Sequence, residues 1–211
     1  MMNRLIVTLL TLLAVSEMYA QEETAPDSTV LEPRPVLALK TNVMADLALG
    51  LNIEAEVPLD SLQRWSLMAE YWTPWYVWHH NSRAYELQVV SLELRRWLSP
   101  CEARPALSGW FAGGYIGVGK FDFEWSSTGD QGEFLSAGLS GGYSWRLSRC
   151  FRLEASAALG VIWDRRSHYR GRFNDTHLIW EYDKRDLYFG PTKLKVSLVW
   201  LLSQKKKGGR S

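Results

Sequence analysis

The sequence is poor in the residue types that build metal and redox sites. Its 211 residues include only two cysteines and four histidines, and none of them has the spacing typical of a zinc site. The formal net charge is +1, so the chain lacks the positive field that attracts nucleic acid. Its glycines follow no strand-to-helix junction of the kind that forms a nucleotide-binding loop. We therefore expect no catalytic residues, no metal, no cofactor and no nucleic-acid partner.

Long apolar runs are also missing after the amino-terminal segment. No later run approaches the roughly 20 apolar residues of a membrane-spanning helix, so a membrane role would require strands. The amino terminus has the layout of a secretory signal: basic Met1–Arg4, apolar Leu5–Val15 and polar Ser16–Ala20. An uncleaved anchor is the alternative, because Met18 stands where cleavage favours a small residue. The predicted organisation is a signal peptide over 1–20, a flexible linker over 21–35, a barrel domain over 36–202 and a basic tail over 203–211.

From Val36 onward, apolar and polar residues alternate with the period of two that is typical of strands. Turn residues divide this region into about eight strands: 36–45, 49–57, 64–73, 85–98, 109–125, 133–147, 151–163 and 193–201. The alternation slips at Val89-Val90, which predicts a bulge, and residues 165–189 are predicted as a long outer loop. The predicted fold class is all-β: a single antiparallel up-and-down β-barrel of about 8 strands, of the outer-membrane type.

Tryptophan is abundant, with 11 residues. If the strands alternate up and down, every tryptophan falls near a strand end or in a loop, at one of two levels. Indole rings favour the level of lipid headgroups, so this distribution predicts the two aromatic girdles of a membrane barrel. One level holds Trp65, Trp97, Trp110, Trp145 and Trp200. The other holds Trp72, Trp75, Trp78, Trp125, Trp163 and Trp180.

The strand faces opposite the large apolar residues carry charges of both signs. The side chains predicted to point inward include Lys40, Asn42, Glu54, Glu56, Glu70, Arg95, Glu154, Lys193 and Lys195. One interpretation is a polar pore or proton path. The favoured one is a structural set of ion pairs that fills the barrel, because an unpaired buried charge is costly.

Two cysteines fall in predicted neighbouring turns. Cys101 and Cys150 could form a disulfide in an exported protein, and two free thiols are the alternative.

The predicted outer loops hold the few candidate ligand-binding residues. A basic cluster could bind the phosphates of lipopolysaccharide or a partner's carboxylates; a solvated hairpin of mixed charge is the alternative. This cluster consists of Arg165, Arg166, Arg170 and Arg172. His79 and His80 are weaker candidates, because adjacent residues of a strand point to opposite sides and chelate poorly.

A lipid-modifying enzyme would require a nucleophile, a base and an orienting carboxylate. The predicted long loop contains residues of these types, but their spacing matches no catalytic motif. They are Asp164, Ser167, His168 and His177.

Three parts of the chain resemble an uncharacterised family from Bacteroidota, domain-of-unknown-function family 3575. They are Leu39–Asn42, Glu93–Leu98, and Phe189–Lys193 with Val196–Trp200. The resemblance extends over Val36 to Leu202, and Gly-Pro-Thr-Lys at the start of the last predicted strand is its most specific element. It implies an exported envelope barrel, in some cases encoded near fimbrial genes, and no established activity. The chain departs from ordinary outer-membrane barrels by continuing past its last aromatic residue into a lysine-rich tail.

The leading hypothesis is a non-enzymatic barrel of unknown specific activity in the outer membrane of a Gram-negative cell. Its role would be structural or in surface interactions, including association with fimbriae. The expected partners are outer-membrane lipid or lipopolysaccharide, and envelope or fimbrial proteins. Two alternatives stay open: an enzyme that modifies outer-membrane lipid, and a soluble periplasmic barrel that binds an apolar ligand.

Overall fold

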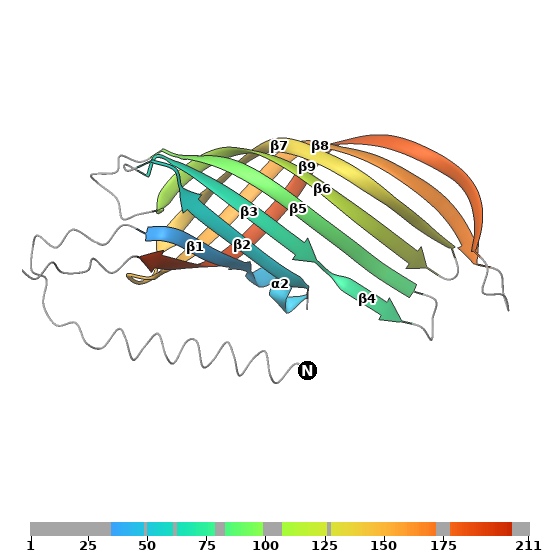
Figure 1. The fold of residues 1–211 in the computed structure, drawn as a ribbon, viewed down its shortest axis with the longest axis horizontal. Coiled ribbons are helices and arrows are strands. Elements are labelled where there is room, and N and C mark those ends of the chain that lie inside the picture. Colours follow the sequence, from blue (N-terminus) through green and yellow to red (C-terminus); the bar gives the residue numbers. More distant parts are fainter. Residues whose placement is uncertain are drawn as a thin grey trace, which may run out of the picture. The chain divides into compact units, whose positions relative to one another are not determined.

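A computed structural model describes residues 35–48, 50–60, 63–78, 83–98, 107–125, 128–171 and 178–203. Within these residues the chain forms nine strands in one antiparallel sheet and one short helix (Figure 1). The elements are β1 (Pro35–Asn42), α2 (Val43–Leu47), β2 (Leu51–Pro58), β3 (Trp65–Thr73), β4 (Trp75–Trp78), β5 (Arg83–Trp97), β6 (Gly109–Trp125), β7 (Thr128–Arg146), β8 (Phe151–Gly171) and β9 (Leu178–Ser203). No helix in this part of the chain is long and apolar enough to cross a membrane. The predicted signal peptide, and nearly all of the predicted linker and tail, lie outside the described residues.

The sheet closes on itself. Its strands follow the order β3-β2-β1-β9-β8-β7-β6-β5, and β3 also pairs with β5. Eight strands therefore form a closed antiparallel ring, and β4 continues β3 beyond Pro74 while pairing with β5. This closure gives both edges of the eight-stranded ring a partner and confirms the prediction of an all-β, up-and-down barrel of about eight strands.

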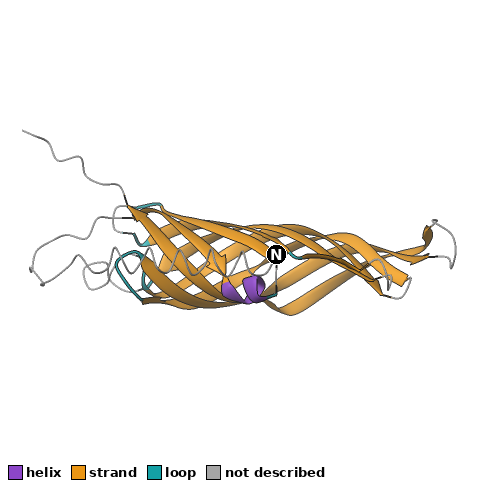
Figure 2. Cartoon of the chain, turned by 90° about the horizontal axis from the view of Figure 1, so that it is seen from below, coloured by secondary structure: helices purple, strands orange, loops and turns teal. Residues whose placement is uncertain are grey.

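The strands differ greatly in length, from 4 residues in β4 and 8 in β1 and β2 to 26 in β9. We call the end of the barrel that carries Pro35 and Ser203 the terminal end; it lies at the left of Figure 1. The opposite end, at the right of Figure 1, is called the extended end. The longer strands continue past the ring as a sheet that is not closed, which Figure 2 shows from below. We call this part the extension. It comprises β4 with residues 83–88, 120–125, 128–133, 165–171 and 178–185, which are joined in register.

Side chains alternate between the two faces of the closed ring, and the polar ones point inward. In β2, Asn52, Glu54 and Glu56 are buried, whereas Leu51 and Ile53 are exposed. The same arrangement recurs in β3 and in the terminal half of β5, where Ser, Glu and Arg are buried and Leu is exposed. Apart from an apolar cluster toward the terminal end that includes Trp97 and Phe111, the closed barrel therefore has a polar interior. Its outer surface is apolar, the reverse of the arrangement around a water-soluble core.

Glycines on the inner face make room for the few large inner side chains. The inner face of β6 carries Tyr115, which is buried against Gly138 and Gly160. A Cβ on Gly160 would lie 2.8 Å from the Tyr115 hydroxyl and 2.3 Å from the Ala137 carbonyl oxygen. These positions therefore need the smallest residue because the opposing ring and the neighbouring strand leave no space.

Two predictions along the strands are wrong. Residues 165–189 are not a long loop: β8 continues to Gly171, and β9 begins at Leu178. No bulge occurs at Val89-Val90, since β5 pairs with β6 in unbroken register; the register shifts lie in the β1–β9 and β8–β9 pairs instead. Both errors have one cause. From Val89 at the edge of the ring outward into the extension, the inner face is no longer uniformly polar, so the alternation that marks a strand in the rest of the ring fades.

The first predicted strand also ends early, at Asn42 instead of Ala45. The Asn42 side chain accepts a hydrogen bond from the Met44 N–H at 3.1 Å and caps α2. Asparagine is a favoured residue at this capping position because its side chain satisfies a free N–H of the first turn.

Candidate functional site

A network of charged side chains occupies the inside of the closed barrel, with Arg95 at its centre. Arg95 is fully buried and contacts three carboxylates from three other positions on the wall. Its Nε lies 2.7 Å from Glu93, and its Nη1 lies 2.8 Å from Glu154 and 3.3 Å from Glu56. Lys40 bridges two of the same groups, at 2.5 Å from Glu56 and 2.6 Å from Glu154. These contacts join β1, β2, β5 and β8 across the interior.

Two lysines of β9 extend this network toward the extended end. The Lys195 ammonium lies 2.9 Å from Glu54 and 3.5 Å from Glu70. The Lys193 ammonium lies 2.6 Å from Glu70 and donates to the Ser91 hydroxyl at 2.7 Å. We call the complete set the interior ion network: Lys40, Glu54, Glu56, Glu70, Glu93, Arg95, Glu154, Lys193 and Lys195.

Eight of the nine inward residues predicted from the sequence belong to this network. Asn42 is the exception, because it caps α2. Glu93 was missed, although the signal was present: it stands two residues before Arg95 and so shares its face. The described part of the network brings four cations against five carboxylates, all within contact distance of an opposite charge. This pairing supports the interpretation of a structural filling over that of an open polar path.

The Gly-Pro-Thr-Lys motif forms the irregular point of the β8–β9 pair. Ala158 pairs with Lys193, and Leu159 pairs with Pro191, so Thr192 is an extra residue on β9. The Tyr115 hydroxyl donates to Thr192, and the Lys193 ammonium lies 4.5 Å from the centre of the Tyr115 ring. The bulge therefore directs Lys193 into the interior ion network while its neighbour anchors Tyr115.

A row of side chains crosses the inner face of the extension from strand to strand. Directly paired positions place Tyr76, Tyr85, Phe123, Asp130 and His168 side by side on β4 to β8. The three aromatic rings stack, with centroids 6.3 Å and 4.8 Å apart. The His168 ring lies 3.0 Å from the Asp130 carboxylate. We call this set the mouth row; it lies in the extension, two residues from the ends of β5, β6 and β7.

The mouth row lines an open cavity of about 740 Å³. Arg83 and Trp125 form its next row, with the guanidinium 3.9 Å from the centre of the indole ring. The Arg83 Nε is buried and makes no hydrogen bond within the described residues. The cavity thus combines exposed aromatic rings with a carboxylate, an imidazole and a guanidinium.

The opposite face of the extension carries a different cluster. The Tyr169 ring covers Gly129, and its hydroxyl donates to the Asp122 carboxylate at 2.6 Å. Burial and this hydrogen bond hold the pKa of the Tyr169 phenol well above its usual value. Burial and the nearby Asp122 carboxylate also raise the pKa of Glu86. Tyr169 therefore stays protonated and ties β8 to β6 over the intervening strand.

The predicted basic cluster does not form a single site in the extension. Arg166 pairs with Asp186 and lies 3.8 Å from Asp164, whereas Arg170 pairs with Glu181 at 3.3 Å. Arg165 is exposed on β8 and pairs in register with Arg185. Arg172, His79 and His80 lie outside the described residues. The described arginines fit a solvated hairpin of mixed charge better than a phosphate clamp.

The residue types of a hydrolytic enzyme are also kept apart. Ser167 donates to Asp183 at 2.5 Å, whereas His168 contacts Asp130 and, at 3.9 Å, Glu181. Adjacent strand residues point to opposite faces, so Ser167 and His168 do not face each other. Asp164 lies beside Arg166, and His177 lies outside the described residues. This arrangement offers no Ser–His pair among the described candidates.

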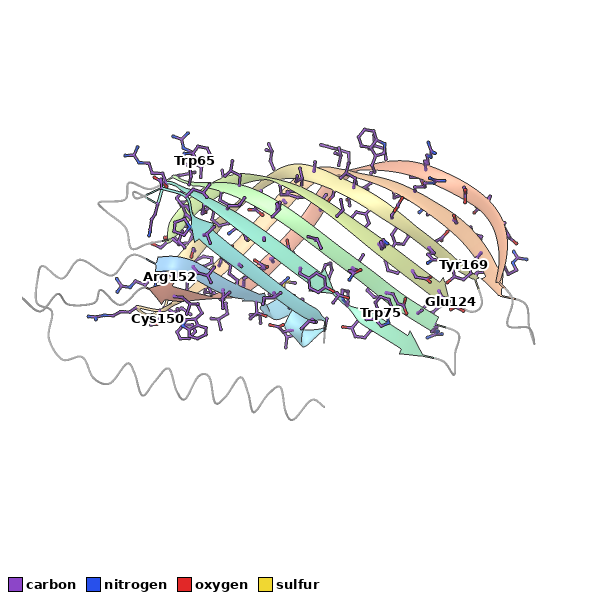
Figure 3. All side chains as sticks on the ribbon, in the orientation of Figure 1. Trp65, Trp75, Glu124, Cys150, Arg152 and Tyr169 are labelled. Atoms are coloured by element: carbon purple, nitrogen blue, oxygen red, sulfur yellow. The ribbon has the colours of Figure 1, made fainter. Side chains whose placement is uncertain are left out.

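The tryptophans divide between the two faces. Those exposed on the outer face are Trp65, Trp110, Trp145 and Trp200 toward the terminal end, and Trp75 and Trp163 toward the extended end. Figure 3 labels Trp65 and Trp75 at these two levels. The side chains of Trp78 and Trp180 lie outside the described set.

Three tryptophans predicted for the girdles lie on the inner face. Trp97 is only 3% exposed, donates to Ser66 at 3.0 Å and packs on Phe111, so its prediction as a girdle residue is wrong. Trp72 pairs in register with the buried Asn52. Trp125 lines the cavity. A position near a strand end does not specify which face carries the side chain, and these three residues follow the alternation of their own strands.

Cys150 lies exposed in the turn between β7 and β8 at the terminal end, as Figure 3 shows. Cys101 falls in the connection between β5 and β6, outside the described residues. The disulfide between them stays a prediction.

A model for a family described as protein of unknown function (DUF3575) matches residues 6–202, and the chain belongs to that family. No curated protein and no solved structure matches the chain.

Proposed function

We propose that this DUF3575 member is a barrel embedded in the outer membrane of a Gram-negative cell, with a structural or surface-interaction role and no catalysis. The observation that carries the proposal is the inverted distribution of side chains in the closed ring. The buried inner side chains are mainly charged or hydroxylic, and the outer face is apolar. Strands with apolar residues outward and polar residues inward are the mark of a membrane barrel.

The outer surface supports this proposal by the size of its apolar band. Exposed residues on neighbouring strands include Ile53, Leu67, Leu92, Leu94, Ile116, Val118, Leu135, Leu139, Leu159 and Leu194. Leu139 alone is 74% exposed. Soluble monomers rarely show so continuous an apolar surface. The outward tryptophans border the band toward both ends, where headgroups of the lipid would lie.

The filled interior favours a structural or interaction role over transport. Ion pairs between strands on opposite walls cross the lumen, including Lys193–Glu70 between β9 and β3. An eight-stranded barrel has an interior just wide enough for its own side chains. The parts of the protein left to contact partners are therefore the outer surface and the extension.

The two alternatives receive less support. A soluble barrel that binds an apolar ligand requires an apolar lumen, whereas the lumen here holds the interior ion network. A lipid-modifying enzyme requires a base beside its nucleophile, and the described residues do not place His168 beside Ser167. Association with fimbrial proteins is the form of interaction that the resemblance to the family suggests, and co-purification of such proteins with the native barrel tests it.

Membrane fractionation of the native protein tests the proposal. We expect the full chain in the outer-membrane fraction, soluble only with detergent. Its electrophoretic mobility should change on boiling, since a barrel closed by hydrogen bonds resists unfolding in detergent at room temperature. Recovery in the periplasmic fraction without detergent would overturn the proposal, because the apolar band would then have to be covered by something other than lipid.

A further inference from the structure

The inner face of the extension carries an aromatic platform that the described residues leave uncovered. Tyr76, Tyr85 and Phe123 lie in one row, and the planes of neighbouring rings differ by 28° and 22°. Tyr85 is 43% exposed and Phe123 is 37% exposed. The rings thus form a nearly flat apolar surface that faces an open cavity.

Polar groups surround this platform with both kinds of hydrogen-bonding partner. Asp130 offers a carboxylate whose side chain is 42% exposed, and His168 lies next to it in the row. The Arg83 guanidinium lies over Trp125 at the other side, with an Nε that has no hydrogen-bond partner in the described residues. A carboxylate acceptor and a guanidinium donor therefore stand within one opening, and the imidazole donates or accepts according to its tautomer.

We infer that the cavity lined by the mouth row, Arg83 and Trp125 binds an uncharged saccharide chain. The C–H face of a sugar ring is apolar and carries slightly positive hydrogens, so it packs against the negative face of an aromatic ring. The hydroxyl groups at its edge both donate and accept, which matches Asp130 and His168 on one side and the Arg83 guanidinium on the other. A few placed polar groups around an apolar surface are typical of ligand sites.

The charges and shape of the cavity argue against other small ligands. A cationic ligand prefers an aromatic cage, whereas these rings are nearly coplanar, and Arg83 already occupies a face of Trp125. An anionic ligand would meet two carboxylates of the lining, Asp130 and Glu124, and only one arginine. A neutral ligand with many hydroxyls has neither difficulty.

The size of the site indicates a short chain of sugars instead of a single ring. The row from Tyr76 to His168 crosses five strands, or roughly 19 Å at the usual spacing between strands. The cavity volume of about 740 Å³ lies within the range of small-molecule sites. Saccharide binding would specify the proposed surface role. The site depends on the proposed function only for its location at the cell surface.

The test uses the full chain, purified in a detergent without a sugar headgroup, on an array of neutral, phosphorylated and carboxylated oligosaccharides. Calorimetry with the neutral oligosaccharide that binds best then compares variants. We expect Tyr85→Leu to weaken binding by about tenfold, since it removes a stacking ring but keeps apolar bulk. Tyr85→Phe should bind like the parent protein. The matched control is Trp163→Leu, which removes an exposed aromatic ring from the outer face.

Three outcomes would overturn the inference: no binding to any neutral glycan, binding only to phosphorylated or carboxylated glycans, or equal affinity for Tyr85→Leu and Trp163→Leu. The change in mobility on boiling verifies that each variant is folded before its affinity is measured. Saccharide binding by a protein found in the periplasm without detergent would contradict the membrane proposal alone. If the protein is found in the outer membrane but binds no saccharide, that outcome would contradict the saccharide site alone.

Discussion

The closed barrel and the extension are built from the same strands, yet they treat ionised side chains in opposite ways. In the closed ring Arg95 is completely buried and contacts three carboxylates. In the extension Arg166 also contacts two carboxylates, but its side chain stays 32% exposed. Ring closure excludes water from the first site, so every charge there needs an ionic partner. Water can replace a lost partner in the second.

This difference explains why the extension is the better place for a ligand. Polar groups of the closed barrel are committed to one another, and removing one leaves its partners buried without compensation. Polar groups of the mouth row border an open cavity and can exchange water for a ligand. The closed ring therefore acts as the scaffold, and the open sheet carries the surface available for binding.

The sharpest test of this comparison removes an arginine from each region. We expect Arg95→Met to destabilise the folded barrel by about 3–5 kcal/mol, because Glu56, Glu93 and Glu154 lose a shared buried cation. Arg166→Met should cost less than about 1 kcal/mol, since its pairs are partly solvated. Urea unfolding of each variant in lipid vesicles measures both free energies of unfolding, with the folded fraction read from electrophoretic mobility without boiling. Similar losses for the two variants would contradict the comparison.

The outer band of the closed ring gives the next largest expected effect. Leu92→Arg places a charge in the apolar band, and we expect a loss of about 2–4 kcal/mol in lipid vesicles. The control is Leu98→Arg, another exposed leucine just past the end of β5, where the same charge would reach water. If both variants unfold at the same urea concentration, the band does not face lipid.

Packing inside the ring can be tested with one added methyl group. Gly160→Ala should destabilise the barrel by about 1–3 kcal/mol through overpacking, since its Cβ would meet the Ala137 carbonyl and the Tyr115 hydroxyl. The same substitution at Gly141, whose Cβ would come no closer than 3.6 Å to its nearest neighbour, should change stability by less than about 0.5 kcal/mol. Equal unfolding midpoints for the two would show that the inner face is loosely packed.

The smallest effect is expected in the extension and depends on pH. A raised pKa means that the folded protein keeps the Tyr169 proton longer than the unfolded chain does. The stability that this provides is present below pH about 10, the usual tyrosine pKa, and is lost as the pH rises further. Asp122→Asn should lower the pKa of Tyr169 and lessen that alkaline loss. Absorbance titration of tyrosinate measures this pKa, and the Tyr169→Phe variant identifies the signal of Tyr169. The same Tyr169 pKa in the parent protein and in Asp122→Asn would contradict the prediction.

The sequence predicted the closed barrel better than the extension, and for a physical reason. A strand shows alternation when its two faces meet different surroundings. In β2, Glu54 and Glu56 lie inside while Ile53 lies outside, so the pattern is clear. On β5, apolar Leu87 in the extension and Val89 at the edge of the ring share the inner face with charged residues further along the strand. The break in alternation there predicts a bulge, and the weaker alternation after Arg165 predicts a loop. The mouth row was missed for the same reason, although Tyr85 and Phe123 belong to predicted strands.

By itself the sequence determined the strand class, the number of strands in the ring and most of the ionised residues inside it, because period-two alternation records which residues share a face. Only the tertiary structure decided which of these residues meet. The pairing of β3 with β5 brings Arg95 within reach of Glu154 across the lumen, and strand register aligns Tyr85, Phe123 and Asp130 in one row. Alternation carries no information about distance across a barrel, so such contacts follow from closure and register.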